Sequence, residues 1–432
     1  MSAKTLGRGI GWLALALLLA GNLVIGARLQ SQAGAAEDRA AGYENIALFT
    51  RVLEQVREQY VEPGKTAYQD LIYGALRGML QSLDPHSQFL DPDMYKEMKD
   101  DTAGEFGGLG IVIGVKDGVL TVVAPMEDTP GFRAGLLPGD KIIEIDGQGT
   151  EALTLSEAIK KLRGAPGTKV SLRVLRPKTQ EIQKLDLVRA RINVPSVKDA
   201  EILESGIGYV RLLQFNERTA GALQEELKKL SGEGMKALVL DLRNNPGGLL
   251  TSAIDVAEKF VPRGEMIVFT QGRSGKPQQT FRAKGRQHYT EMPMVILVNG
   301  GSASAAEIVA GALKDHRRAI LVGEKTFGKG SVQSVVQLDD GSAIRLTTAY
   351  YYTPSKRVIH EQGIEPDILI PMPPEDWRKL LLKRSRPENA EPEAGEEAAD
   401  DIVDVQLQRA LDVLKGVMIF TAQRETPAMA SR

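Results

Sequence analysis

The 432-residue sequence contains no cysteine and only four histidines. The absence of cysteine excludes disulfide bonds, a thiolate nucleophile and metal sites built on cysteine. It leaves the cellular compartment open, because an oxidising compartment does not require disulfides. The formal net charge is only −2, so the sequence lacks the positive excess of a broad nucleic-acid surface, and we expect no nucleic-acid partner. The length allows two or three domains.

The N-terminus predicts an export signal or a membrane anchor within residues 1–35. Lys4 and Arg8 precede the apolar run IGWLALALLLAGNLVIGA, and the small-residue stretch AGAAED follows, with cleavage expected after Ala27 or Ala35. The run is long for a cleaved signal and short for a membrane span, so an uncleaved inner-membrane anchor stays open. Either alternative predicts that the bulk of the chain is periplasmic or otherwise exported.

Two regions follow with different periodicities. Residues 38–103 are predicted to be helical, because apolar residues such as Ile46, Phe49 and Val52 recur at helical spacing. Residues 104–190 alternate short β-branched runs with glycine turns, which predicts a small β domain.

Residues 195–370 alternate apolar strand patterns with amphipathic helix patterns, which predicts a layered α/β core around a largely buried sheet. The fold class expected from the whole sequence is therefore a multidomain α/β (α+β) chain, in which the layered core carries an inserted β domain and helical N- and C-terminal segments. The expected strands are IGYVRLLQF, ALVLDLR, MVILVNG, RAILVGE and GSAIRLTTAYYY, and the expected helices are TAGALQEELKKL, LLTSAIDVAEKFV and SAAEIVAGALKDH.

The tail changes character again. Residues 371–402 contain the acidic stretch RPENAEPEAGEEAADD and predict a linker. Residues 403–432 predict an amphipathic helix with one apolar stripe, formed by Val403, Leu407, Ala410, Leu411, Leu414 and Met418. Either this stripe packs back on its own chain, or it mediates oligomerisation or partner binding, which predicts a homo-oligomer formed through the terminal helices.

The segment NGGSASAAEIVAGAL places Ser302 and Ser304 between an apolar strand and an apolar helix. A hydroxyl there meets free backbone N–H groups and the positive end of the helix dipole. Such groups can stabilise an oxyanion beside a serine nucleophile, but both serines are equally compatible with helix capping. A nucleophilic serine also needs a base. None of the four histidines, His86, His288, His316 and His360, lies in a glycine-bounded setting typical of a catalytic base.

The segment GEKTFGKGSVQ offers lysine as the base. A lysine acts as a base when burial or positive neighbours lower its pKa. In an extended segment Lys329, Ser331 and Gln333 point to the same side, so that an amide could orient the lysine. Lys325 shares this parity, and the pattern alone does not choose between the two lysines.

Several motifs occur together and in one order: SLDPHSQFL, LDLRNNPGGLL, GSASAAEIVAGAL, GEKTFGKGSVQ and HEQGIEPDI. Over about residues 40–370 the sequence resembles the carboxy-terminal processing peptidases, also called tail-specific proteases. The resemblance implies a serine endopeptidase that cleaves proteins at or near their C-termini, with Ser304 as nucleophile, Lys329 as base and Gln333 as the assisting amide. Lys325 would then be a neighbour whose charge, if close, helps to keep Lys329 neutral.

The segments GGLG and NNPGG lack the spacing that phosphate-binding loops use, and we expect no metal or cofactor. The resemblance also implies an oxyanion hole. One donor would be the backbone N–H of Ala305, and the other an N–H of the NPGG turn, from Gly247 or Gly248. Two other classes stay open. One is a catalytically silent scaffold that captures exported proteins, and the other is a different enzyme, such as an acyl-transfer enzyme, on a similar core.

Residues 104–190 resemble a PDZ domain of the kind found in exported proteases. The loop Gly108-Leu109-Gly110-Ile111 matches the loop whose N–H groups hold the terminal carboxylate of a peptide, and the adjoining strand edge can accept an extended peptide. The resemblance implies that the domain binds C-termini of protein substrates and gates the catalytic cleft through Arg163. Arg163 is equally compatible with a solvated helix-terminal cation. An activating adaptor protein is a further expected partner.

Overall fold

The computed structural model describes residues 42–425 apart from a few short gaps, at 117, 127–128, 137–138, 152, 154, 178, 286–288 and 386–401. The chain divides into two compact units, and the boundary in the sequence lies between Leu83 and Asp84. The predicted signal or anchor in residues 1–35 lies outside the described residues. No helix among the described residues is long and apolar enough to span a membrane.

The N-terminal unit is helical, as the periodicity predicts. Residues 42–59 form a helix, and a short 3-10 turn, η1 (Pro63–Lys65), leads into α2 (Tyr68–Gln81). Within this unit large apolar side chains are exposed, among them Ile46, Phe49 and Val52.

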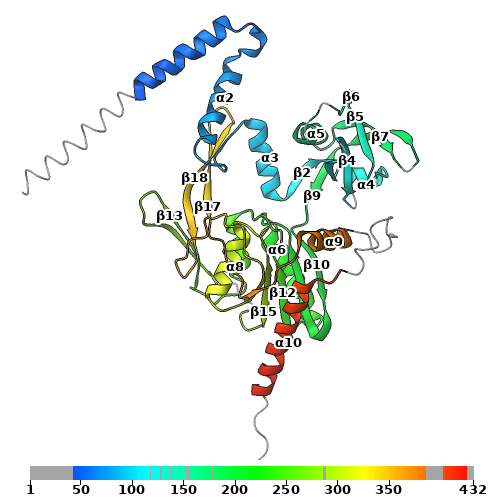
Figure 1. Ribbon diagram of the computed structural model, residues 1–432, viewed down its shortest axis with the longest axis vertical. Coiled ribbons are helices and arrows are strands. Elements are labelled where there is room, and N and C mark those ends of the chain that lie inside the picture. Colours follow the sequence, from blue (N-terminus) through cyan, green and yellow to red (C-terminus); the bar gives the residue numbers. More distant parts are fainter. Residues whose placement is uncertain are drawn as a thin grey trace, which may run out of the picture. The chain divides into compact units, whose positions relative to one another are not determined.

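The core of the second unit is a six-stranded sheet in which only the β10 edge strand is antiparallel (Figure 1). Helices lie in the connections from β11 to β12, from β12 to β15 and from β15 to β16, because parallel neighbours need a crossover connection. Every residue of β12 and β15 is buried, which explains their unbroken apolar sequences ALVLD and MVILV. The strand order is β10 (Val197–Ile202), β11 (Ile207–Leu212), β12 (Ala237–Asp241), β15 (Met294–Val298), β16 (Ile320–Gly323) and β19 (Ile368–Leu369).

Helices cover both faces of this sheet. One face packs on α6 (Thr219–Gly232), α7 (Leu250–Ala257) and α8 (Ala305–Asp315), and these three helices and the alternation with β11, β12, β15 and β16 confirm the predicted layered core. The other face packs on α10 (Val405–Glu425), which Figure 1 shows in red beside β12 and β15.

The apolar stripe of the tail helix packs on the sheet of its own chain. Ala410, Leu411 and Leu414 of α10 are buried against the sheet, and Leu407 and Met418 pack around them. The first of the two alternatives for the stripe therefore holds for these residues. A homo-oligomer formed through the terminal helices stays a prediction.

A second, antiparallel sheet stands beside the core, in the order β1 (Gln88–Leu90), β18 (Ala343–Tyr352), β13 (Met266–Gly272) and β14 (Pro277–Arg282), with β17 (Ser331–Gln337) also paired to β18. The GSAIRLTTAYYY strand belongs to this sheet and not to the parallel one. β1 comes from the DPHSQFL motif, and its pairing with β18 brings residues 88–90 next to the strand that also pairs with β17, which follows the GKGS loop.

The inserted β domain is connected to the rest of the chain by a two-stranded antiparallel ribbon, in which β2 (Glu105–Gly108) pairs with β9 (Ala190–Asn193). Between them a sheet runs in the order β3-β4-β5-β7-β8, with its own apolar core around Leu109, Ile142 and Leu172. Among the described residues the strand β3 (Ile111–Lys116) pairs only with β4 (Val119–Pro125), so β3 is an edge strand. The remaining elements are β5 (Lys141–Ile145), β6 (Gln148–Gly149), β7 (Lys169–Arg176), β8 (Glu181–Val188), α4 (Pro130–Arg133) and α5 (Leu155–Leu162).

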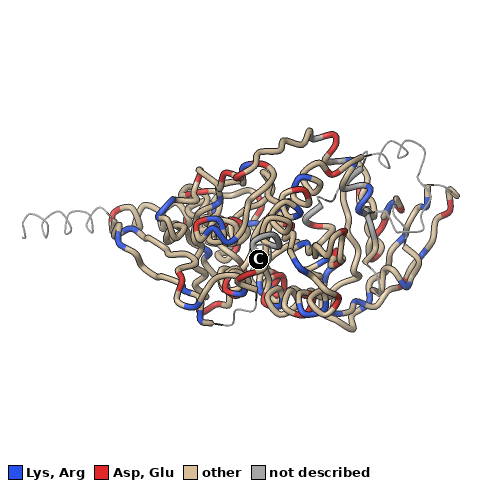
Figure 2. Tube along the Cα trace, turned by 90° about the horizontal axis from the view of Figure 1, so that it is seen from below, with Lys and Arg blue, Asp and Glu red and all other residues tan. Residues whose placement is uncertain are grey.

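Charges of both signs are interspersed along the described chain (Figure 2). This distribution agrees with the balance of 54 Lys and Arg against 56 Asp and Glu in the sequence.

The packing of α10 predicts a large difference between two apolar residues on one helix. Leu414 is 1% exposed and Ile419 is 61% exposed. We expect Leu414→Ala to lower the free energy of unfolding by about 2–5 kcal/mol, because it leaves a cavity against the sheet. Ile419→Ala should change it by less than about 0.5 kcal/mol. Urea unfolding followed by intrinsic fluorescence measures both, and equal effects of the two variants would contradict the packing.

Candidate active site

The two motifs that carry the predicted chemistry follow neighbouring parallel strands. β12 runs into LRNNPGG and β15 runs into NGGSASA, and the strands pair in register up to Asp241 and Leu297. Carboxyl ends of parallel strands lie at one edge of a sheet, where α/β proteins bind their ligands. The structure therefore brings the NPGG turn and the serine turn together at this edge.

The structure separates the two serines of the turn. Ser302 is fully buried, and its hydroxyl donates to the carbonyl of Leu242 (2.8 Å) and accepts from the N–H of Asn299 (3.0 Å). Ser302 thus ties the ends of β12 and β15 to each other, and its oxygen is committed to structure.

Ser304 lies at the N-cap of α8 and is only partly buried. Its backbone has φ 55° and ψ −112°, a conformation that non-glycine residues avoid. Strained backbone of this kind concentrates at functional sites, where the surroundings hold it in place. The serine side chain is therefore presented at the helix N-terminus by an enforced turn.

Glu307 lies at the start of α8. It holds the serine turn in place and joins it to the loop that carries Lys329, residues 324–330, which we call the lysine loop. Its buried carboxylate accepts from the N–H of Ser304 (2.8 Å) and from the N–H of Lys329 (2.8 Å), both through Oε2. Its Oε1 accepts from the Thr326 hydroxyl (2.5 Å) and the Gly328 N–H (2.7 Å). Burial raises the pKa of Glu307, and these four hydrogen bonds oppose that rise.

Sequence reasoning missed Glu307, although the sequence held a signal for it. The run Ser-Ala-Ala-Glu has the spacing of a capping box, in which the acidic side chain at the third helical position accepts the N-cap N–H.

The two lysines of GEKTFGKGSVQ have different surroundings. Lys325 is exposed and forms an ion pair with Glu365 (2.8 Å), whereas Lys329 is partly buried. Burial lowers the pKa of Lys329, and the positive charge of Arg345 lowers it further. The neighbouring charge that acts on Lys329 is thus Arg345 and not Lys325. Arg345 is held by the carbonyl of His86 and by Gln88 of β1.

The HEQGIEPD motif packs against the lysine loop. A Cβ on Gly330 would lie 2.1 Å from the backbone nitrogen of His360, so only glycine fits there. The N–H of Glu361 donates to the carbonyl of Gly328, and the N–H of Ile364 donates to the Thr326 hydroxyl. These contacts hold the loop in addition to the hydrogen bonds that Glu307 accepts.

The NPGG turn lies against the serine turn. A Cβ on Gly247 would stand 2.7 Å from the Cβ of Ser304 and 2.9 Å from the nitrogen of Ala305, so the two turns touch. The N–H of Gly247 donates to the side-chain oxygen of Asn245 (2.9 Å) and is therefore occupied. The N–H groups of Gly248 and Ala305 have no acceptor among the described residues. Of the two glycines left open by the sequence, Gly248 is the one with an unused donor.

Gln333 lies on β17 beside a bulge between Val332 and Gln333. Its Nε2 donates to the hydroxyls of Ser331 (2.8 Å) and Thr347 (3.4 Å), and Thr347 in turn bonds to Asp84 of the DPHS turn. Among the described residues no hydrogen bond joins Gln333 to Lys329, or Lys329 to the hydroxyl of Ser304. The amide nitrogen is thus committed to neighbours, whereas the amide oxygen accepts no hydrogen bond from a described residue.

The histidines take structural or peripheral positions. His316 bonds to the carbonyl of Met266, and the ring of His360 stacks on Tyr350 at 4.5 Å. Burial lowers the pKa of His86, and the charge of Lys329 lowers it further. The effect of Lys329 indicates that the DPHS turn lies close to the site. None of these three bonds to Ser304, and His288 lies outside the described residues.

In the β domain, the predicted carboxylate loop lies at the start of the edge strand β3. Leu109 is buried in the domain core, and Gly110 has φ 69°, with the Thr129 side chain where a Cβ would be. The N–H groups of Leu109 and Gly110 have no acceptor among the described residues. Ile111 begins β3, which packs near α5, so the loop, the free strand edge and the helix occur together.

Arg163 directly follows α5 and reaches away from it. Its guanidinium pairs with Asp101 of α3 (Pro92–Ala103) at 3.2 Å and lies over the ring of Phe106 of β2 at 4.5 Å. The terminal carbonyls of α5 are instead bound by Arg189, which donates to the carbonyls of Lys161 and Leu162. The helix-terminal cation of this domain is therefore Arg189, a residue that the sequence did not single out.

Comparisons with known proteins agree with this architecture. The profile of peptidase family S41 matches residues 206–370, and a PDZ domain profile matches residues 121–176. The carboxy-terminal-processing protease of Bartonella bacilliformis is 43% identical over 397 residues, which cover 88% of this chain and 90% of the relative. The carboxyl-terminal-processing protease of Synechocystis sp. is 39% identical over 384 residues, which cover 87% and 84%.

A solved structure of a photosystem II D1 C-terminal processing protease is also similar, with 32% identity and a TM-score of 0.46, over 75% of this chain and 92% of that chain. The assignment rests on the sequence relatives, which are similar over nearly their full length. The chain belongs to the carboxy-terminal processing proteases of peptidase family S41, and it is a serine-type peptidase with a PDZ domain.

Proposed function

We propose that this carboxy-terminal processing protease cleaves its substrates with a Ser304–Lys329 dyad. The observation that carries the proposal is the bridge through Glu307, since one carboxylate oxygen accepts the N–H groups of both residues at 2.8 Å. The two backbone nitrogens therefore cannot be farther apart than the sum of these two bonds. A nucleophile and a base must be held at such a fixed separation to act together.

In the proposed reaction, neutral Lys329 takes the proton of the Ser304 hydroxyl as Oγ attacks the carbonyl carbon of the scissile peptide bond. The resulting oxyanion accepts from the N–H groups of Ala305 and Gly248, which have no acceptor among the described residues. Lys329 then gives its proton to the leaving amine. A water molecule, deprotonated by Lys329, hydrolyses the acyl-enzyme in the same way.

Gln333 has a supporting place in this scheme. Because its Nε2 donates to two hydroxyls, its Oε1 is the atom that accepts from Lys329 and orients the amine. The hydrogen bond from Ser304 to Lys329 forms when substrate is bound, since catalytic hydrogen bonds tighten in the substrate complex.

The PDZ domain supplies the preference for C-termini in this proposal. The N–H groups of Leu109 and Gly110 bind the terminal carboxylate, and the edge of β3 pairs with the last residues of the substrate. Arg163, which contacts α3 and β2, transmits occupancy of the PDZ domain by a substrate to the core.

The signal in residues 1–35 exports the chain and leaves it in the periplasm or anchored at the inner membrane. An adaptor protein activates it there.

The dyad predicts complete loss of activity from two substitutions. Ser304→Ala and Lys329→Ala should each lower kcat/KM on an unstructured protein substrate by at least about 1,000-fold, because removal of either member of such a pair disables both. Lys325→Ala is the matched control, and its rate should equal that of the unmodified protein. Full activity of Ser304→Ala would refute the assignment of the nucleophile.

The Glu307 bridge predicts a joint loss of stability and activity. In Glu307→Gln an amide NH₂ replaces one acceptor and faces N–H or O–H donors. We expect the free energy of unfolding to fall by about 1–3 kcal/mol and kcat/KM to fall by about 100-fold, because both loops shift.

The control for Glu307 is Glu225→Gln, the same change at an exposed position of α6. It should alter neither quantity. Urea unfolding and peptidase assays of the same preparations test both effects, and a fully active Glu307→Gln protein would show that the bridge does not set the site.

The lowered pKa of Lys329 predicts a specific pH dependence. Because the base acts in its neutral form, kcat/KM should rise as the pH rises through the pKa of Lys329, below the ordinary pKa of a lysine. Arg345→Met removes a positive neighbour, so this pKa should increase and the rising limb should move to higher pH. Lys325→Met should leave the limb in place. A limb that moves only in Lys325→Met would contradict the role of Arg345.

A further inference from the structure

A cluster of four charged residues, two of them buried, lies on the α10 face of the sheet, just before the NPGG turn in the chain. Side chains alternate along β12 and the residues after it, so Asp241 and Arg243 point to the α10 face, whereas Leu240 and Leu242 join the core on the other side. Asp241 and Arg243 are almost completely buried, and Arg384 of α9 (Pro374–Ser385) completes the cluster with Asp404.

Arg243 makes the maximum number of hydrogen bonds that its side chain allows. Nε donates to Asp241 (2.9 Å), and Nη2 donates to Asp241 (2.6 Å) and to Asp404 (2.8 Å). Nη1 donates to Asp404 (2.8 Å) and to Gln406 (3.1 Å). Three of these five acceptor contacts come from residues that follow Arg243 by more than 160 positions.

The residues that supply these contacts are the first residues of the α10 segment. Oδ1 of Asp404 also accepts from the N–H of Leu407 at 3.0 Å, so the carboxylate that holds Arg243 caps α10 as well. Gln406 donates to the carbonyl of Ile370 and is 1% exposed. Docking of α10 and completion of the Arg243 contacts are therefore one event.

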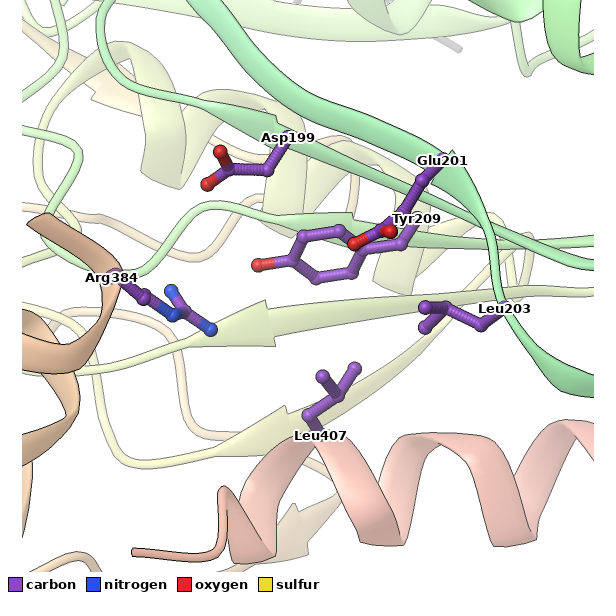
Figure 3. A pocket seen from close by; sticks show the side chains of 6 residues that line it. All are labelled: Asp199, Glu201, Leu203, Tyr209, Arg384 and Leu407. Atoms are coloured by element: carbon purple, nitrogen blue, oxygen red, sulfur yellow. The ribbon is translucent and has the colours of Figure 1, made fainter. Parts of the chain in front are cut away.

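The outer side of the cluster is open to solvent. Figure 3 shows a pocket between Tyr209 of β11, Arg384 of α9 and Leu407 of α10, with a volume of about 220 Å³. The Tyr209 hydroxyl donates to Asp241 and Arg384 donates to Asp404. Arg384 lines this pocket, and the Asp404 side chain to which it bonds is 10% exposed, whereas the Arg243 side chain is fully buried.

Arg243 is coupled to the oxyanion donors through the turn that it begins. Its own N–H donates to Asp241, and the N–H of Asn244 donates to Asn299 in the serine turn. Asn245 holds the N–H of Gly247, and its carbonyl accepts from the N–H of Ala303. A displacement of Arg243 therefore moves the turn that carries Gly248 relative to Ser304.

We propose that the Asp404–Gln406 segment is a positioning element for the NPGG turn, which carries the oxyanion donor Gly248. We further propose that the contact of this segment with Arg243 sets the rate of the chemical step. Without that contact three donors of a buried cation lose their acceptors, which a folded chain avoids by moving the cation toward water. Arg243 then draws the turn toward the α10 face and takes Gly248 out of position. The inference rests on the proposed oxyanion role of Gly248 and Ala305, and it adds the tail of the chain to the machinery of the site.

Asp404→Asn in the full-length chain tests the proposal. Asparagine caps a helix as well as aspartate does, but it removes the charge and one of the two acceptors for Arg243. We expect kcat on a fluorogenic peptide to fall about 10- to 100-fold, because a displacement of about 1 Å at a catalytic group has effects of this size. KM should stay within about threefold. Asp412→Asn, on the exposed side of α10, is the matched control and should keep both constants.

Chemical rescue separates positioning from a general structural role. In Asp404→Ala, sodium formate should restore kcat at least fivefold, because formate fits the vacated place and again accepts from Arg243, whereas sodium chloride of equal ionic strength should not. A folded Asp404→Ala protein that stays inactive in formate would contradict the proposal, as would an Asp404→Asn protein with unchanged kcat.

If Asp404→Asn melts below the assay temperature, Gln406→Met replaces it. This change keeps the side-chain length and removes one acceptor for Arg243, together with the donor to the Ile370 carbonyl. We expect kcat to fall about three- to tenfold, and an unchanged kcat would contradict the proposal. The result is independent of the nucleophile test. An inactive Ser304→Ala protein together with a fully active Asp404→Asn protein would refute only the positioning element, and an active Ser304→Ala protein would refute the proposed dyad.

Discussion

The site depends on one buried carboxylate. Glu307 lies in the first turn of α8, out of contact with water, and accepts four hydrogen bonds. An ionised carboxylate in that position is tolerated only when its acceptor capacity is used, so the four donors and the carboxylate require one another. The donors belong to the serine turn, after a strand of the parallel sheet, and to the lysine loop, before a strand of the antiparallel sheet. Glu307 therefore joins two sheets at the point where the proposed chemistry occurs.

A second buried charge organises the opposite side of the same edge. Arg243 points to the α10 face because side chains alternate along the chain, and its neighbours Asn244 and Asn245 bond into the serine turn. The NPGG turn thus lies between a cation held from one face and a carboxylate-held serine turn on the other. This arrangement explains why Gly247 and Gly248 are glycines, since a Cβ at either position would lie within 2.7 Å of a neighbouring atom.

Much of the architecture follows from periodicity, because fully buried parallel strands and amphipathic crossover helices leave strong patterns in sequences such as ALVLD and MVILV. The place of Ser304 at a strand-to-helix turn could be predicted for the same reason. Its choice over Ser302 came from a resemblance, and the structure supplies a physical reason, since the Ser302 hydroxyl is bonded on both sides.

Other features depend on tertiary packing and leave no local signal. Gly247 and Gly248 are equivalent in sequence, and only the fold reveals that Asn245 occupies the first N–H. The capping pattern announces Glu307 at a helix start, but its reach to Lys329 depends on how a loop packs 22 residues later. The apolar stripe on α10 would be the same whether it packed on its own chain or on a partner. The sequence could therefore not distinguish these two alternatives. The pairing of Asp404 with Arg243 spans 161 residues and has no counterpart in any local pattern.

The most direct test of the account is a crystal structure of the full-length protein with a peptide aldehyde whose terminal aldehyde replaces the scissile carbonyl. The account predicts a covalent bond from the aldehyde carbon to Ser304 Oγ. It also predicts that the hemiacetal oxygen lies about 2.7–3.1 Å from the backbone nitrogens of both Ala305 and Gly248. Attachment to another residue, or an oxygen bound by Gly247 in place of Gly248, would contradict it.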